Sequence, residues 1–174
     1  MPDLCLMPLE GIQVHELLAF ERGNRAFFEA RINARPAEYY AIDGIQRALD
    51  AAAADRANDR AYAYAVRAGG VLLGRVNLSQ VKRQHFHCAE LGYRIGEAYL
   101  GRGIGSQAVA LVMAEAFGPL GLARLQATVP PYNLGSIRVL ERNGFQAFGR
   151  SRRSFWHGDQ WHDLLYFEVH AWQP

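Results

Sequence analysis

The chain has 174 residues, a length that suits one domain, and half of its residues are hydrophobic, so it can bury a core and is not a disordered tail. Its formal net charge of +2 is too weak to indicate a nucleic-acid-binding protein. The cysteines Cys5 and Cys88 form no metal or redox motif, and the N-terminus carries acids where a signal peptide has basic residues, so we expect a protein of the reducing cytoplasm.

The first half of the chain predicts one strand, two helices and a hairpin. In chain order these are a strand over 4–10, helices over 14–31 and 44–55, and paired strands over 61–68 and 71–81. Gly23 is expected to break the first helix. The hydrophobic period changes to two before the hairpin, which turns at Gly69 and Gly70.

The second half alternates strands and helices. The predicted elements are a strand over 87–96, a helix from Ile104 onward, a strand over 123–129, a helix over 133–143, and a closing hairpin over 145–155 and 160–172. Along 87–96, one face is made of Leu91, Tyr93 and Ile95, and the other of Glu90, Gly92 and Arg94. Asn133 should cap the helix 133–143 and Gly144 should end it. This order of elements predicts a single α/β (α+β) domain over residues 1–174.

Residues 99–108, YLGRGIGSQA, have a glycine at every second position directly before a helix: Gly101, Gly103 and Gly105. The first N–H groups of a helix have no partner within it, and the helix dipole adds partial positive charge there. Glycines let a phosphate approach these N–H groups closely, so the stretch predicts a pyrophosphate site. The alternative is a tight turn without a ligand. The pattern matches neither the dinucleotide fingerprint nor the Walker loop.

A second motif follows about thirty residues later, in YNLGSIRVLERNGF. A strand–glycine loop–helix–strand unit followed by N-x-x-S-x-x-x-L-E-x-x-G-F resembles the acyl-CoA-binding half of the GNAT acetyltransferase superfamily over residues 88–148. Within it, residues 76–105 and the tail 149–167 are similar to the RimJ/RimL-type N-terminal acetyltransferases of ribosomal proteins. The positions that carry the likeness in the tail are Gly158, Trp161 and Asp163.

The resemblance implies a GNAT fold, with a mixed, mostly antiparallel sheet that splays between two parallel strands and is flanked by helices. Acetyl-CoA would lie in that gap, its pantetheine pairing with the backbone of Tyr93 and Ile95 and Asn133 contacting it from the next helix. Its pyrophosphate would lie on Gly101, Arg102, Gly103, Ile104, Gly105 and Ser106. The family usually opens this loop with Gln or Arg where this chain has Leu100, so we expect slightly weaker anchoring.

Direct transfer to an amine needs a base, an oxyanion stabiliser and a proton for the sulfur. An α-amine has a pKa of about 8 against about 10.4 for lysine, so a modest carboxylate is sufficient for it. Glu90 is the candidate base, and a solvent-facing strand carboxylate is the equal alternative. A backbone N–H near Ile95 would stabilise the oxyanion.

The proton for the leaving thiolate has a less direct source. Many GNAT enzymes place a Tyr where this chain has Leu140, so Ser136 is the candidate donor and Tyr132 a weaker one. The alternative for Ser136 is a helix hydroxyl that bonds a carbonyl one turn back.

Three other groups of residues allow both a functional and a purely structural interpretation. His85 and His87 share a strand face, but no third ligand is placed, so no metal is predicted. The segment Trp161–Asp163 either contacts substrate or packs the hairpin. The basic cluster attracts an acidic peptide, ribosomal RNA or the CoA 3′-phosphate, or is simply solvated; its members are Arg150, Arg152 and Arg153.

Together these observations predict an acetyl-CoA-dependent N-acetyltransferase that acts on a protein α-amine, with a ribosomal protein as a possible partner and with neither DNA nor a membrane expected. One alternative is an acetyltransferase of a small amine or antibiotic. Another is a non-catalytic acyl-CoA-binding sensor, favoured by Leu140 and Leu100. The sequence names neither the acceptor nor the oligomeric state.

Overall fold

The computed structural model describes residues 3–171, within which seven strands form one sheet in the order β1-β2-β3-β4-β5-β7-β6. The strands are β1 (Leu4–Pro8), β2 (Tyr62–Ala68), β3 (Val71–Lys82), β4 (Cys88–Ile95), β5 (Arg124–Val129), β6 (Gln146–His157) and β7 (Gln160–His170). The helices are α1 (Val14–Gly23), α2 (Arg25–Glu29), α3 (Ile42–Ala57), α4 (Ile104–Phe117) and α5 (Leu134–Arg142), with 3-10 turns η1 (Leu9–Gly11), η2 (Ala37–Tyr40) and η3 (Glu97–Tyr99). The predicted mixed α/β architecture is confirmed.

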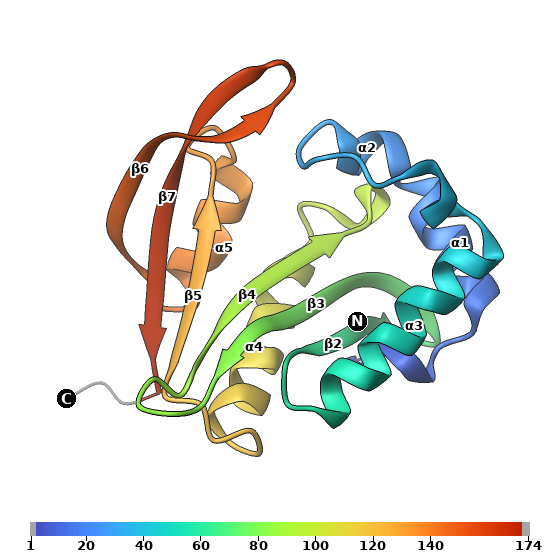
Figure 1. The fold of residues 1–174 in the computed structure, drawn as a ribbon, viewed down its shortest axis with the longest axis horizontal. Helices are drawn as coiled ribbons and strands as arrows, with labels where there is room; N and C mark the ends of the chain where they lie inside the picture. Colours follow the sequence, from blue (N-terminus) through green and yellow to red (C-terminus); the bar gives the residue numbers. More distant parts are fainter. Residues whose placement is uncertain (1–2, 172–174) are drawn as a thin grey trace.

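Helices cover both faces of the sheet, as Figure 1 shows, with α1–α3 on one face and α4 and α5 on the other. Each layer has its own apolar core. Leu17, Ile45 and Leu72 belong to the core under α1–α3. Val76, Val112 and Leu125 belong to the core between the sheet and α4, and all three are fully buried. The two cores fix the sheet from both sides and leave its strand ends to form a site.

The predicted elements are close to the observed ones. The first long helix breaks at Asn24, one residue after the predicted Gly23. Asn133 caps α5 as predicted, since its Oδ1 accepts a hydrogen bond from the Ser136 N–H at 3.2 Å. Gly144 follows α5 with a φ of +79°, which is the left-handed conformation that favours glycine at a helix end. The last residue of the predicted final strand, Trp172, lies outside the described residues.

Strands β4 and β5 are parallel neighbours that pair over a short length only. Their register runs from Cys88 opposite Arg124 to Glu90 opposite Gln126. Beyond that point β4 continues to Ile95 on β3, and β5 continues to Val129 on β7. Figure 1 shows the two strands diverging from their paired ends. The sheet therefore opens between them, as the sequence resemblance implies.

Candidate active site

The open edge of β4 presents backbone groups to the gap. The Gly96 N–H donates to the Leu73 carbonyl of β3 at 2.9 Å. Successive N–H groups point to opposite sides of a strand, so the N–H groups of Ile95 and Tyr93 point away from β3. They face the side on which pairing with β5 has ended. This edge can therefore accept an extended ligand as an added strand.

The glycine loop lies at the end of the same gap. Gly101 and Gly103 have φ values of +72° and +75°, which a residue with a side chain rarely adopts. Gly103 is the N-cap of α4, and no side chain caps the first N–H groups of that helix. A Cβ atom at Gly101 would meet nothing within 4 Å. The backbone is thus bare and exposed over 101–103, which suits an anion.

The other predicted phosphate residues lie deeper. Ile104 is buried in the core. Gly105 lies inside α4, where an added Cβ would come within 3.5 Å of Val139 and 3.7 Å of Ile95. The Asn143 Nδ2 donates to the carbonyl and the hydroxyl of Ser106, at 3.2 Å each. The structure therefore gives Gly105 and Ser106 packing roles against α5, and Arg102 extends from the exposed part of the loop.

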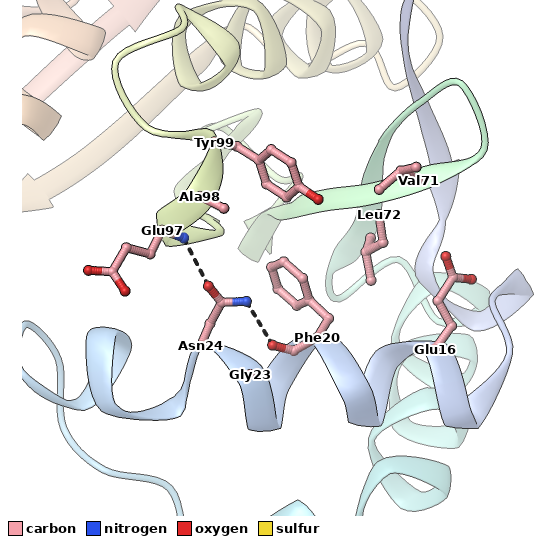
Figure 2. A pocket seen from close by; sticks show the side chains of 9 residues that line it. All are labelled: Glu16, Phe20, Gly23, Asn24, Val71, Leu72, Glu97, Ala98 and Tyr99. Carbon is pink, nitrogen blue, oxygen red and sulfur yellow. Dashed lines mark hydrogen bonds between the residues drawn. The ribbon is translucent and has the colours of Figure 1, made fainter.

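A hollow of about 470 Å³ lies on the other side of η3, between α1 and the start of β3 (Figure 2). Asn24 lies in its wall and connects two elements. Its Oδ1 accepts a hydrogen bond from the Glu97 N–H, and its Nδ2 donates to the Phe20 carbonyl, both at 2.9 Å. Asn24 therefore holds the start of η3, the turn that leads into the glycine loop, against α1.

Tyr93 connects β4 to the first turn of α5. Its phenol oxygen lies 2.7 Å from the Ser136 Oγ and 3.3 Å from the Ser136 carbonyl. Burial raises the pKa of Tyr93 to about 12, and the hydrogen bond with Ser136 opposes that shift only in part. The phenol therefore stays protonated near neutral pH and can donate to Ser136. The sequence predicts a backbone role for Tyr93 and does not predict this side-chain contact.

Leu140 of α5 and Asn133, the residue that caps this helix, each have a defined role in the structure. Leu140 is buried in the main core, with 1% of its surface exposed. A tyrosine at this position would therefore have to enter a region that leucine fills here. Asn133 uses its amide oxygen as the helix cap, which leaves its NH₂ group as the part able to contact a ligand.

Glu90 lies at the fork of the two strands. It is the last residue of β4 that pairs with β5, and it is exposed. Gln80 of β3 donates to its Oε2 at 2.9 Å. Glu90 shares its face of β4 with Arg94, and this face is turned toward α1 and α2. A water-accessible carboxylate at the start of the gap is suited to accept a proton, directly or through water.

The most unusual charged group in the structure is Glu21 of α1, which is fully buried. Its Oε1 accepts a hydrogen bond from the Arg75 guanidinium of β3, and its Oε2 lies 3.6 Å from Arg94. This cluster was not predicted from the sequence. Its signal was present, since Glu21 stands four residues after the buried Leu17 on the same side of the helix.

The tip of the closing hairpin reaches across to α2. The His157 Nε2 donates to the Glu29 carbonyl at 3.1 Å, and the His162 Nε2 donates to the His157 carbonyl at 2.9 Å. The rings of His162 and Tyr132 pack edge to face, 5.1 Å apart. The hairpin therefore bounds the α2 side of the gap, and Figure 1 shows the two segments inclined toward each other.

Asp163 has a structural place within that hairpin. Its carboxylate accepts from the Arg153 N–H at 2.9 Å and from the Arg150 Nε at 2.8 Å. The hydrogen bond from Arg153 and then that from Arg150 lower its pKa. Trp161 packs on Trp156 and remains exposed.

One local expectation was wrong. His85 and His87 lie in the turn between β3 and β4, with φ values of +60° and +42°, so they do not share a strand face. A buried Cys88 opens β4 after them. Within residues 3–171 no three His, Cys, Asp or Glu side chains gather as a metal site. Over the same residues, the structure has no helix that is both long and apolar enough to cross a membrane.

The comparisons with known proteins agree with this geometry. Residues 6–146 match the family model described as the acetyltransferase (GNAT) domain. The chain is 35% identical over 162 residues to the probable N-acetyltransferase YjcK of Bacillus subtilis, covering 92% of this chain and 90% of that protein. The chain therefore belongs to the GNAT acetyltransferase family, and its relatives are named as N-acetyltransferases.

Two solved structures share the fold. The ribosomal-protein-S5-alanine acetyltransferase of Vibrio fischeri has a TM-score of 0.89 at 22% identity, covering 98% of this chain and 94% of that one. RimJ of Mycobacterium smegmatis, in complex with CoA-disulfide, has a TM-score of 0.87 at 22% identity, covering 97% and 82%. At these identities the likeness shows a shared fold, which is the fold that the sequence resemblance implies.

Proposed function

We propose that this protein transfers the acetyl group of acetyl-CoA to the N-terminal α-amine of a protein or peptide. The observation that carries the proposal is the opening of the sheet between β4 and β5, beside a helix N-terminus that begins in bare, exposed glycine backbone. Structural neighbours that acetylate a ribosomal protein or bind CoA support the donor and the class of acceptor.

The residues at the gap fit acetyl-CoA. The exposed loop Gly101–Gly103 and the first N–H groups of α4 would hold the pyrophosphate, and the β4 edge at Tyr93 and Ile95 would pair with the pantetheine. The NH₂ group of Asn133 would add a contact from α5. When bound, acetyl-CoA supplies an activated acetyl thioester. The groups that hold it are largely backbone, so Leu100 at the start of the loop does not remove the site.

Three groups of this chain would then carry the chemistry. Glu90 takes the proton from the acceptor ammonium, directly or through water, and so produces the neutral amine. The Ile95 N–H donates to the oxygen on which negative charge develops. As the amine nitrogen bonds to the thioester carbon and the carbon–sulfur bond breaks, Ser136 donates its hydroxyl proton to the departing sulfur and the protonated phenol of Tyr93 donates to the Ser136 Oγ. The second proton that the nitrogen loses on becoming an amide passes to solvent, which returns a proton to the phenol.

The test uses a set of peptides that are identical except at their amines. One peptide has a free N-terminus and no lysine, a second has a blocked N-terminus and one internal lysine, and a third has both amines blocked. Mass spectrometry of the products should find acetylation of the first peptide only. Label mainly on the lysine peptide, or on small amines with neither peptide modified, would refute an α-amine acceptor while leaving acetyl transfer intact.

A further inference from the structure

An acceptor can reach the gap from one face of the sheet only. The opposite face is filled by α4 and α5 and by the main core. The open face is the one that carries Glu90 and Arg94, four residues apart on β4, and α1 and α2 flank it. Arg94 therefore stands beside the path that an acceptor amine must take. In this part of β4 the pairing with β5 has already ended.

Arg94 has no complete partner within the part of the chain that the structure describes. Its closest carboxylate is Glu21, at 3.6 Å, which is beyond a good hydrogen bond. The closer Arg75 binds Glu21 through Oε1 and also donates to the Tyr39 hydroxyl at 2.9 Å, while the Glu21 Oε2 that faces Arg94 has no hydrogen-bond partner among the described residues. The Arg94 guanidinium lies over the Phe28 ring, with its carbon 5.2 Å from the ring centre. Its side chain keeps 22% of its surface exposed.

A second guanidinium adds to the positive charge. Arg35 stacks on the Tyr39 ring at 4.2 Å, and its Nε is buried without a hydrogen-bond partner among the described residues. Arg75 and Arg94 thus share the single carboxylate of Glu21, and Arg35 adds positive charge near Arg94. Burial, and then the charge of Arg35, lower the pKa of Arg94 to about 10 against the opposing effect of Glu21. Arg94 is still charged at neutral pH, in a place where an additional anion would be stabilised.

We propose that Arg94, with Arg35 beside it, binds a carboxylate of the acceptor, so that the preferred substrate is a peptide with an acidic side chain within its first few residues. This inference rests on the proposed acetylation of α-amines. A guanidinium offers a planar pair of donors that matches a carboxylate, and a charge-assisted bond of this kind is stronger than a neutral one. Arg94 and Arg35 are therefore residues that select the acceptor, and they do not take part in the chemical step.

The experiment compares peptides in which one side chain ends either in a carboxylate or in an amide. Peptides with a free N-terminus carry either Glu or Gln at position two, three or four, and calorimetry measures their dissociation constants for the full-length protein. At one position at least, the Glu peptide should bind tenfold or more tightly than its Gln partner. The ratio should fall as salt is added, because the contact is ionic. Equal binding of Glu and Gln at every position would overturn the inference.

Variants then assign the preference to the cluster. Arg94→Met keeps the length of the side chain and removes its charge, so the Glu-to-Gln ratio should fall to within twofold of one, with the Gln peptide bound within threefold of wild type. Arg94→Lys should keep part of the ratio, and Arg35→Met should lower it. Arg67→Met is the matched control: Arg67 of β2 pairs with Glu16 of α1, so its substitution should leave the ratio unchanged. A full ratio in a folded Arg94→Met would refute the assignment.

The experiments distinguish failure of the role inferred for Arg94 from failure of the proposed α-amine acetylation. If α-amines are acetylated without any preference for acidic peptides, only the role of Arg94 is refuted. If acidic peptides bind through Arg94 and no peptide is acetylated, the acceptor assignment fails while the carboxylate site stands. Should Arg94→Met not fold, as judged by its melting curve, the ratios measured with Arg94→Lys and Arg35→Met decide the question.

Discussion

Substitutions at two glycines can distinguish the loss of a phosphate site from the effect of backbone strain alone. Gly101 and Gly121 both have a positive φ, +72° and +59°, and a Cβ atom on either would meet nothing within 4 Å. Gly101 lies in the loop before α4, and Gly121 lies in the turn after the far end of that helix. Replacing each by alanine therefore applies the same local strain at two ends of one element, only one of which faces the gap.

The magnitudes follow from the geometry. An alanine in the left-handed region costs about 1–2 kcal/mol. For a chain of this size each kcal/mol lowers the melting temperature by about 2–4 °C, so both variants should melt about 2–8 °C below wild type. Only Gly101→Ala puts a methyl group where the phosphate would approach. We expect it to raise the acetyl-CoA dissociation constant at least tenfold, which is about 1.4 kcal/mol.

The assay is calorimetric titration with acetyl-CoA at a temperature at which both variants are folded, beside thermal melting of each. Gly121→Ala should bind acetyl-CoA within threefold of wild type. If Gly101→Ala does the same while showing the expected loss of stability, the loop is a strained turn without a ligand. A loss of affinity in both variants would mean that strain in α4, and not the bare backbone, controls binding.

Four further outcomes are expected. Glu90→Gln should lower kcat/KM by about a hundredfold near pH 7, and the loss should shrink above about pH 8, where the acceptor amine is neutral without help. Ser136→Ala should lower kcat without that recovery at high pH. A pH–rate profile of each variant beside wild type distinguishes the two. Tyr93→Phe should flatten the alkaline part of the stability curve measured by denaturant unfolding. The pKa of Tyr93 is raised to about 12, so its contribution is complete below the unfolded value of about 10 and is lost as pH rises toward 12. Asn24→Ala removes two hydrogen bonds, so amide exchange at Glu97 should become faster and the free energy of unfolding should fall by about 1–2 kcal/mol. The role of Glu90 as a base should not change.

Features encoded locally were predictable from the sequence. The alternating glycines predict a bare helix entrance, because positive φ and missing side chains are properties of the residues themselves. Asn133 three residues before Ser136 predicts the cap that forms. The period of two along 87–96 predicts which residues of β4 share a face. In each case the partners lie within a few residues of one another, so no knowledge of the tertiary packing is needed.

Contacts between distant segments were not predictable. Tyr93 and Ser136 are 43 residues apart, and their 2.7 Å contact depends on how α5 packs across the open sheet. The same limit explains the error at His85 and His87. Strand periodicity was extended through a segment whose backbone turns with positive φ, and nothing in the residue types marks that turn as strongly as a glycine would.

The surroundings of Glu21 show both what the sequence predicts and what only the fold determines, and they bear on the identity of the acceptor. A carboxylate at a core-facing helix position is costly unless it is paired, so its presence in the sequence requires a buried cation elsewhere in the chain. The sequence alone offers 19 lysines and arginines and no means of choosing among them. The fold selects Arg75 as the hydrogen-bonded partner and brings Arg94 to 3.6 Å from the same carboxylate. Arg75 binds one oxygen of Glu21, while Arg94 stays 3.6 Å from the other, so Arg94 keeps donors for an anion that would enter with the acceptor on the open face of β4.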